Sequence, residues 1–268
     1  MNIKQIRNVT IIITYAGKKF LVDPMLAPKG LYPGIMGTPN SHLSNPLVEL
    51  PVSLDEITNV DAIIVTHIHF DHIDEVALKV LPKNLKTFVQ DEKEAKEMRE
   101  FGFTDVEVLT TNTMFDDIKL IKTSGIHGED ETVINFFKEA NLSHNVCGII
   151  FNHENEDTLY LAGDTVWCDE VKESIETYNP DVIILNAGDA QFSNGKSLIM
   201  GKNDVYEVCK VAPMSTVIAS HMEAVNHATL SRKELREFAD KNNLSNLLIP
   251  LDGQSYDFNK YISLLVII

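Results

Sequence analysis

The segment from Thr66 to His72 constrains the fold more than any other part of the sequence. It places three histidines and one aspartate within six consecutive positions: His67, His69, Asp71 and His72. An apolar run at 61–65 precedes it directly and is typical of a buried strand. Side chains two residues apart in an extended chain point the same way, so His67, His69 and Asp71 can converge while His72 turns toward a neighbouring position. The pattern therefore indicates a metal site for two ions at the end of an interior strand, rather than scattered surface histidines.

Other short apolar runs and amphipathic stretches predict an alternation of strands and helices. The first two strands form a hairpin over 9–15 and 19–22, with a turn at Gly17. The remaining strands are expected at 61–65, 88–89, 106–109, 118–122, 147–151, 158–162, 182–185, 217–219 and 247–249. Helices are expected at 92–101, 169–178, 204–211 and 231–241, the last beginning with a capping box of Ser231 and Glu234.

The alternation continues through both halves without a linker or low-complexity tract. We therefore expect a single domain, 1–268, of the α+β class, with sheets in the core and helices outside. The proline-rich segment 24–51 is far longer than the usual connection of about 4 to 6 residues, and such loops often face substrate. The apolar end at 262–268 is too short for a membrane anchor, and we expect a terminal strand packed on the body or on a partner subunit. The segments 24–51 and 262–268 both permit subunit contacts, so a homo-oligomer is possible.

Composition limits the classes of partner. The formal net charge is −16, from 39 acidic and 23 basic residues, which argues against nucleic acid because its binding depends on Lys and Arg. The three cysteines lack CxxC spacing, so neither a disulfide framework nor a thiolate zinc site is predicted. No apolar run reaches the roughly 18 to 20 residues of a membrane span, and the start is not a signal peptide. We expect a cytoplasmic protein that acts on a small molecule, without membrane or nucleic-acid partners.

The donor-rich segment resembles the signature of the metallo-β-lactamase superfamily, His-x-His-x-Asp-His, which is intact from His67 to His72. The resemblance extends over most of the chain and implies a four-layer αββα sandwich with metals held by loops at one edge of two sheets. It also implies three later ligands. His127 would complete one site with His67 and His69, Asp164 would bridge two ions, and His221 would complete the second site with Asp71 and His72.

Each later ligand follows a predicted strand, and each has an alternative interpretation. His127 could be a polar loop histidine, and Asp164, beside Gly163, could be only a turn residue. His227 competes with His221, which we prefer because it lies directly at a strand end like the other ligands. His227 is then expected to contact substrate. Cys168 is interpreted as a buried thiol rather than a ligand.

Within the superfamily the sequence is most similar to the ascorbate-6-phosphate lactonase-like group of metal-dependent hydrolases. The residues that carry this likeness are 21–24, 45–47 and Asn186-Ala187-Gly188. Asn186 joins His227 as an expected substrate contact. Asp23 either orients a ligand imidazole or forms an ordinary Asp-Pro turn.

The donor set predicts hydrolysis. Two divalent ions can share a water and lower its pKa, so that hydroxide attacks a lactone, ester or amide. Asp71 and Asp164 are the expected proton acceptors. Imidazole and carboxylate ligands suit zinc, manganese or iron. We expect zinc first, and manganese second because of the lactonase-like resemblance.

Three other functions remain open. The first is a phosphodiesterase or ribonuclease of the same superfamily, and the excess of acidic over basic residues argues against it. A non-catalytic metal-binding protein would need a site saturated by protein ligands. A di-iron oxidoreductase ranks last, because such relatives carry Glu where this chain has His69 and need a flavin domain. The sequence lacks a Gly-rich nucleotide-binding loop, so no nucleotide cofactor is expected.

Overall fold

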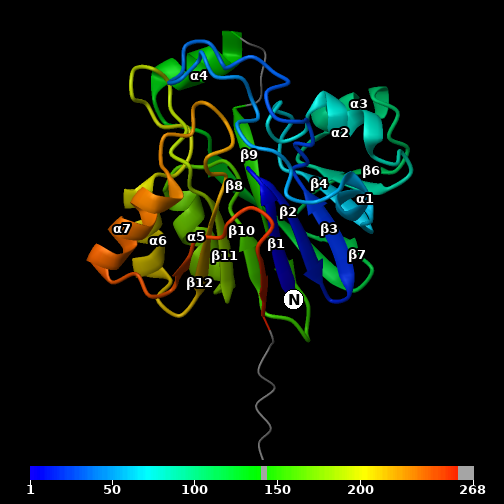
Figure 1. Cartoon of the computed structure of the whole chain (residues 1–268). Coiled ribbons are helices and arrows are strands. Elements are labelled where there is room, and N and C mark those ends of the chain that lie inside the picture. Colours follow the sequence, from blue (N-terminus) through cyan, green and yellow to red (C-terminus); the bar gives the residue numbers. More distant parts are fainter. Residues whose placement is uncertain (140–143, 259–268) are drawn as a thin grey trace, which may run out of the picture.

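Two sheets face each other in the computed structural model, and helices cover their outer faces (Figure 1). The structure describes residues 1–139 and 144–258. The apolar end at 262–268, expected to be a terminal strand, lies outside the described residues. Among those described, none of the helices combines the length and the apolarity that crossing a bilayer requires.

The first sheet contains the amino-terminal strands and has the order β14-β1-β2-β3-β4-β5-β6. The bounds are β1 Asn2–Arg7, β2 Thr10–Tyr15, β3 Lys18–Val22, β4 Ala62–Val65, β5 Lys86–Val89, β6 Val106–Val108 and β14 Ser255–Asp257. The hairpin of β2 and β3 is confirmed, with Ile12 opposite Leu21. It is not the first element, because β1 precedes it and pairs antiparallel with β2. The strands from β3 to β6 run parallel.

The second sheet has the order β13-β12-β11-β10-β9-β8-β7. The bounds are β7 Thr113–Phe115, β8 Ile118–Ile126, β9 Asn145–Asn152, β10 Leu159–Leu161, β11 Val182–Asn186, β12 Thr216–Ser220 and β13 Leu247–Leu248. The strands from β7 to β10 are antiparallel, and those from β10 to β13 are parallel. As a result β8, β10, β11 and β12 all end at the same edge.

Three apolar layers separate the sheets and helices. Neighbouring residues of one strand enter different layers, as the two-residue period of a strand requires. Ile64 packs between the sheets and Ile63 packs under the helices of the first sheet. Ile184 likewise lies between the sheets, while Ile183 packs under the helices of the second. The four-layer α+β sandwich expected from the sequence is confirmed.

The helices fall into two groups and one outlier (Figure 1). Their bounds are α1 Leu54–Thr58, α2 Glu75–Val80 and α3 Glu92–Glu100 on the first sheet, α5 Asp169–Tyr178, α6 Lys202–Val211 and α7 Arg232–Asn242 on the second, and α4 Glu131–Glu139. The sequence predicted α3, α5, α6 and α7, and Ser231 and Glu234 form the expected capping box. It missed α1 and α2, which have only five and six residues, and α4, which lies at one end of the sandwich.

The long loop between β3 and α1 is held by buried polar groups. The guanidinium of Arg7, which is fully buried, donates to the carbonyl oxygens of Met25, Ala27 and Val48 at 2.7, 2.9 and 3.0 Å. Farther along, the side chain of Asn226 accepts from the Ile35 amide at 3.0 Å. The loop is therefore fixed against the body of the protein.

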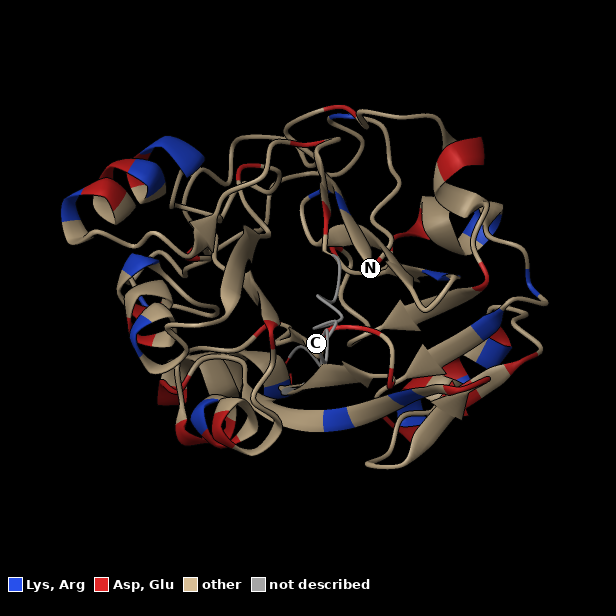
Figure 2. Cartoon of the chain, turned by 90° about the horizontal axis from the view of Figure 1, so that it is seen from below, with Lys and Arg blue, Asp and Glu red and all other residues tan. Residues whose placement is uncertain are grey.

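Charged residues of both signs share the outer helices. Figure 2 shows blue and red alternating along the helices at the periphery, seen from below. This mixture does not form the continuous basic stripe that is typical of nucleic-acid-binding surfaces.

Candidate metal centre

The predicted ligands lie where strands end at one edge of the two sheets. His67 follows β4 after one residue, His127 and His221 follow β8 and β12 directly, and Asp164 is the third residue after β10. All seven predicted ligand side chains are buried, with His69 the most exposed at 9%. The parallel strands thus bring together residues that are as many as 154 positions apart, from His67 to His221.

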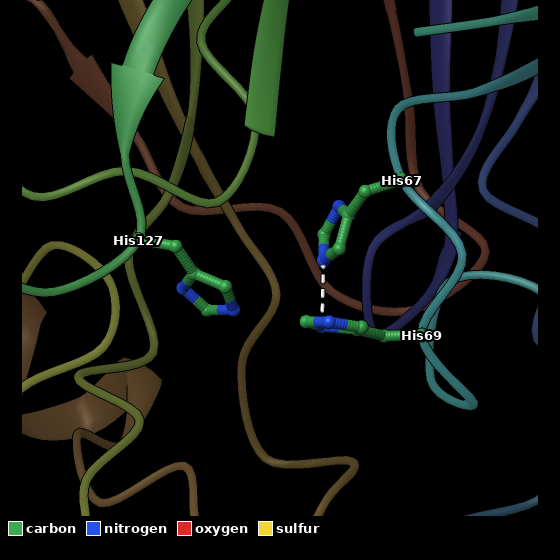
Figure 3. A group of neighbouring side chains, drawn as sticks. All are labelled: His67, His69 and His127. Carbon is green, nitrogen blue, oxygen red and sulfur yellow. Dashed lines mark hydrogen bonds between the residues drawn. The ribbon is translucent and has the colours of Figure 1, made fainter. Parts of the chain in front are cut away.

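One group of donors consists of His67, His69 and His127. His67 Nε2 lies 2.9 Å from His69 Nδ1, and His127 faces this pair from the opposite side (Figure 3). His127 Nδ1 is 3.0 Å from the carbonyl oxygen of Leu198, which fixes the ring and leaves Nε2 for the pair. The three donor atoms lie within 4.8 Å of one another, close enough to share one ion.

Two further groups share His72: Asp71 with His72 and His221, and His67 with His72 and Asp164. Asp164 Oδ2 is central to the whole cluster. It lies 3.0 Å from His72 Nε2, and 3.8 to 3.9 Å from Nε2 of His127, His221 and His67. This oxygen therefore lies among imidazole donors of all three groups.

Buried hydrogen bonds orient the ligand side chains. Asp23, at the end of β3, accepts from the backbone and hydroxyl of Thr66, both at 2.7 Å, and its Oδ2 lies 3.0 Å from His72 Nδ1. The predicted contact of Asp23 with an imidazole of the donor segment is therefore present, at His72. Asn186 donates to Asp164 Oδ1 at 2.7 Å, which leaves Oδ2 for the histidines. Such contacts fix ring orientation and ligand basicity.

The backbone at His221 adopts an uncommon conformation. Its φ is +59°, in the left-handed region, and its amide donates to the carbonyl oxygen of Asn8 at 3.0 Å. A Cβ on Gly188 would lie 2.0 Å from the His221 carbonyl oxygen, so only glycine permits this approach. Backbone strain of this kind persists where the surrounding structure holds it, typically at functional sites.

Burial keeps most of the imidazoles neutral. It lowers the pKa of His67 and His127, and it lowers the pKa of His69 to about 3. The positive charge of His72 lowers the pKa of His67 and His69 further. Neutral imidazole is the form that binds metal.

Neighbouring carboxylates raise the pKa of His72 and His221 instead. Burial alone would lower the pKa of His72, but Asp164 and Asp23 hold it well above its ordinary value. Asp164 and Asp71 raise the pKa of His221 in the same way. These imidazolium groups keep the pKa of Asp71 and Asp164 below the usual range despite burial. The carboxylates thus require positive charge nearby, which either protons or metal ions can supply.

The donor set fits a divalent metal. Both ring nitrogens of His221 are buried without a hydrogen-bond partner among the described residues, although Nε2 is 3.4 Å from Asp71 Oδ2. Buried polar atoms are normally paired, so these nitrogens indicate a missing partner. Imidazole and carboxylate together match the ligand preferences of zinc, manganese and iron.

A cavity of about 270 Å³ opens onto the cluster. Its polar lining comes from Thr38, His69, Asp71, His127, Asp164 and His227. The other lining residues are Ile35, Phe70, Phe136, Phe137, Ala190, Phe192 and Leu198. His227 therefore lies where a substrate contact was predicted. Asn186 does not line the cavity, and its amide is instead bonded to Asp164.

The sequence did not reveal the aromatic wall of this cavity. Phe137 of α4 stacks on His69 with ring centroids 5.3 Å apart, and Phe136 contacts Phe192 at 4.7 Å. The spacing of Val133, Phe136 and Phe137 matches one face of a helix and was the available signal. Nothing in that spacing shows that the helix covers a site formed by other strands.

Comparison with known proteins decides the family. The family model described as a beta-lactamase superfamily domain matches residues 18–222. The chain belongs to the metallo-β-lactamase superfamily. It is 54% identical over 260 residues to UPF0173 protein YddR of Bacillus subtilis, covering 96% of this chain and all of that protein. A protein of Metallosphaera sedula described as a UPF0173 metal-dependent hydrolase is 23% identical, covering 95% of this chain and 98% of its own length.

Two solved structures resemble this member of the superfamily over nearly its whole length. An isothiocyanate hydrolase from Delia radicum gut bacteria has 42% sequence identity and a TM-score of 0.93, covering 97% of this chain and 100% of that one. A possible metal-dependent hydrolase from Veillonella parvula has 39% identity and a TM-score of 0.92, with coverages of 96% and 98%. The chain is a metal-dependent hydrolase of the superfamily. Its likeness to ascorbate-6-phosphate lactonases remains a prediction.

Proposed function

We propose that this hydrolase uses two divalent ions to cleave small, uncharged, largely apolar molecules with an electrophilic carbon, and that isothiocyanates, R–N=C=S, are the favoured class. The observation that carries the proposal is the cavity over the donor cluster. Its walls combine Phe136, Phe137 and Phe192 with aliphatic side chains, and no Lys or Arg is among the described residues that line it. A neutral apolar group fits such walls better than an anionic one.

Two basic side chains in the second half of the chain are engaged in ion pairs. Lys196 Nζ pairs with Asp130 at 2.9 Å, and Arg232 pairs with Glu223 at 2.8 Å and with Asp252. An anionic phosphodiester or a phosphorylated lactone would therefore enter this cavity without a basic side chain to bind it. This argues against the phosphodiesterase alternative.

The relative with 42% identity supports the substrate class. It is described as an isothiocyanate hydrolase, and the alignment covers the full length of that chain. An isothiocyanate is small and uncharged, and its central carbon is electrophilic. Each of these properties suits the cavity.

Hydrolysis of an isothiocyanate adds the oxygen of water to the central carbon and breaks the carbon–nitrogen bond. Both hydrogens of the water end on nitrogen, so the products are the amine R–NH₂ and carbonyl sulfide. Bound divalent ions would supply Lewis acidity that activates water and stabilises developing negative charge. Asp71 and Asp164 border the cavity and can accept the released proton.

His227 is the proposed substrate contact. It lines the cavity and is only 6% exposed, and its Nδ1 has no partner among the described residues. Burial lowers its pKa to about 4, so the ring is neutral and one nitrogen can donate a hydrogen bond. It lies outside the three groups of candidate metal donors.

A lactone, ester or amide is the second candidate class. Its carbonyl carbon is attacked by the same activated water, and an uncharged member would fit the same apolar walls. Zinc, manganese and iron all remain suitable metals for either class.

The test combines metal analysis with a substrate panel. Purified protein is stripped with a chelator, reloaded with zinc, manganese or iron, and assayed against phenethyl isothiocyanate, lactones, esters and phosphodiesters. We expect isothiocyanate turnover that disappears on chelation and returns with metal. Turnover of phosphodiesters alone would overturn the substrate proposal.

Two variants separate metal binding from substrate contact. We expect His69→Ala to lower metal content and abolish turnover, because it removes one of the three donors in the group of His67, His69 and His127. We expect His227→Ala to retain metal content while its kcat/KM falls about 2- to 10-fold, as for the loss of one hydrogen bond of about 0.5 to 1.5 kcal/mol. Equal metal content in wild type and His69→Ala would contradict the ligand assignment.

A further inference from the structure

A second, apolar groove lies beside the cavity. Its volume is about 490 Å³. Its lining residues come from the long loop, the donor segment and the turn after it, α2, and the residue that follows α3: Tyr32, Pro33, Gly34, Ile35, Ile68, His69, Phe70, Ile73, Asp74, Glu75, Leu78 and Phe101. The groove exposes large apolar side chains, since Phe70 is 37% and Phe101 is 47% exposed. Exposed apolar surface that is contiguous and concave is typical of binding sites.

The groove and the cavity are adjoining compartments. Ile35, His69 and Phe70 line both of them, so these side chains form the partition between the two spaces. The cavity alone is slightly smaller than the roughly 300 to 1,000 Å³ of typical small-molecule sites, whereas the two compartments together fall within that range. The other donors that line these spaces, Asp71, His127 and Asp164, line only the cavity.

We propose that the site takes elongated substrates, with the reacting group in the cavity and an uncharged apolar tail that passes Phe70 into the second groove. The proposal rests on the proposed function, because it assigns the tail of a substrate whose head is hydrolysed at the donor cluster. The shared partition residues make the groove continuous with the reaction site, which favours a substrate tail as its occupant.

Charge in the groove restricts the tail to uncharged groups. The carboxylate of Asp74 accepts from the backbone amides of Ala27 and Ala77, both at 2.7 Å, and so is not available to bind a ligand. Glu75 pairs with Lys79 at 3.3 Å on the exposed surface. The described lining thus contains two acidic side chains and no Lys or Arg, which disfavours a terminal carboxylate on the tail.

A chain-length series tests the proposal through binding alone. The probes are n-alkyl hydroxamic acids, whose head group chelates metal ions, titrated calorimetrically into zinc-loaded protein. Each methylene that becomes buried in the groove tightens Kd about fourfold, from the ~0.8 kcal/mol of one buried methylene. We expect this gain to continue beyond the chain length that fills the cavity.

Phe101→Glu places a charge at a residue that lines the groove but not the cavity, and Val80→Glu is its matched control. Val80 is 41% exposed, lies on α2 and does not line the groove. We expect Phe101→Glu to remove the gain for long chains and to leave short-chain binding unchanged. We expect Val80→Glu to behave as wild type for both.

Several outcomes would overturn the proposal. Long and short hydroxamates that bind equally in wild type would exclude a tail compartment, and so would an unchanged chain-length gain in Phe101→Glu. If Phe101→Glu instead changes the oligomeric state by light scattering, the groove is a subunit interface. Failure of every hydroxamate to bind would refute the metal centre itself, whereas intact isothiocyanate turnover without chain-length dependence would refute only the tail.

Discussion

Replacing Glu94 by Gln should make the stability of the protein less dependent on pH. Glu94 lies on α3 beneath the donor segment and is 2% exposed. Its Oε1 accepts from the Ile68 amide at 2.9 Å and from Gln90 Nε2 at 2.7 Å, while Oε2 is buried without a partner among the described residues. Burial raises the pKa of Glu94 to about 7, because ionisation would leave a charge in an apolar environment.

The magnitude follows from the difference between the folded and unfolded pKa values. The ordinary value is 4.5, and the shift to about 7 corresponds to roughly 3 kcal/mol at 1.36 kcal/mol per unit. Between these two values the folded state binds more protons than the unfolded state, so the stability contributed by Glu94 falls as pH rises. That contribution is complete below pH 4.5 and lost above pH 7.

The assay is urea unfolding of metal-free wild type and Glu94→Gln across pH 4.5 to 8. The difference between the two free energies of unfolding should change by about 3 kcal/mol in favour of the variant as pH rises, because glutamine cannot ionise. The decisive quantity is how this difference changes with pH, because contributions from other titrating groups are common to both proteins and cancel. Glu100→Gln, on the exposed end of the same helix, is the control and should show no such change. A difference that stays constant with pH would refute the reasoning.

Two further predictions concern the backbone around the site. Gly188→Ala should displace the His221 carbonyl oxygen, which a Cβ would approach to 2.0 Å, and should lower the bound metal measured by elemental analysis while leaving the far-ultraviolet circular dichroism unchanged. A variant with full metal content would show that this loop can shift freely. Arg7→Met should cost at least about 3 kcal/mol of unfolding free energy, because three carbonyl groups lose their buried donor. It should also expose the segment 24–51 to limited proteolysis, and resistance equal to wild type would contradict this role.

The sequence predicted the strands and the donor residues better than the surroundings of the site. The positions of His127, Asp164 and His221 at strand ends followed from apolar runs with a polar residue after each, a local pattern. The orientation of Asp164 by Asn186 could not be derived, because it depends on two parallel strands lying side by side. The likeness to the superfamily identified which of these residues belong together.

The cavity walls depended on contacts between segments distant in sequence. Helix α4 was missed, although its apolar residues have helical spacing, and its Phe137 covers His69. The loop at Ile35 is held by Asn226, a contact across 191 positions that no local pattern encodes. Propensity and periodicity predict each helix or strand separately, so they do not predict the cavity that several elements enclose.

The distribution of the donors over both sheets has a consequence for how the protein matures. His67 and Asp71 belong to the first sheet's edge, while His127, Asp164 and His221 come from the second, so a chain in which only one half has folded lacks a complete set. High-affinity metal binding must then follow the docking of the two halves, so the ion binds and stabilises only fully assembled molecules. In a preparation supplied with excess ion, the fraction of protein that takes it up would measure successful folding before any substrate is added.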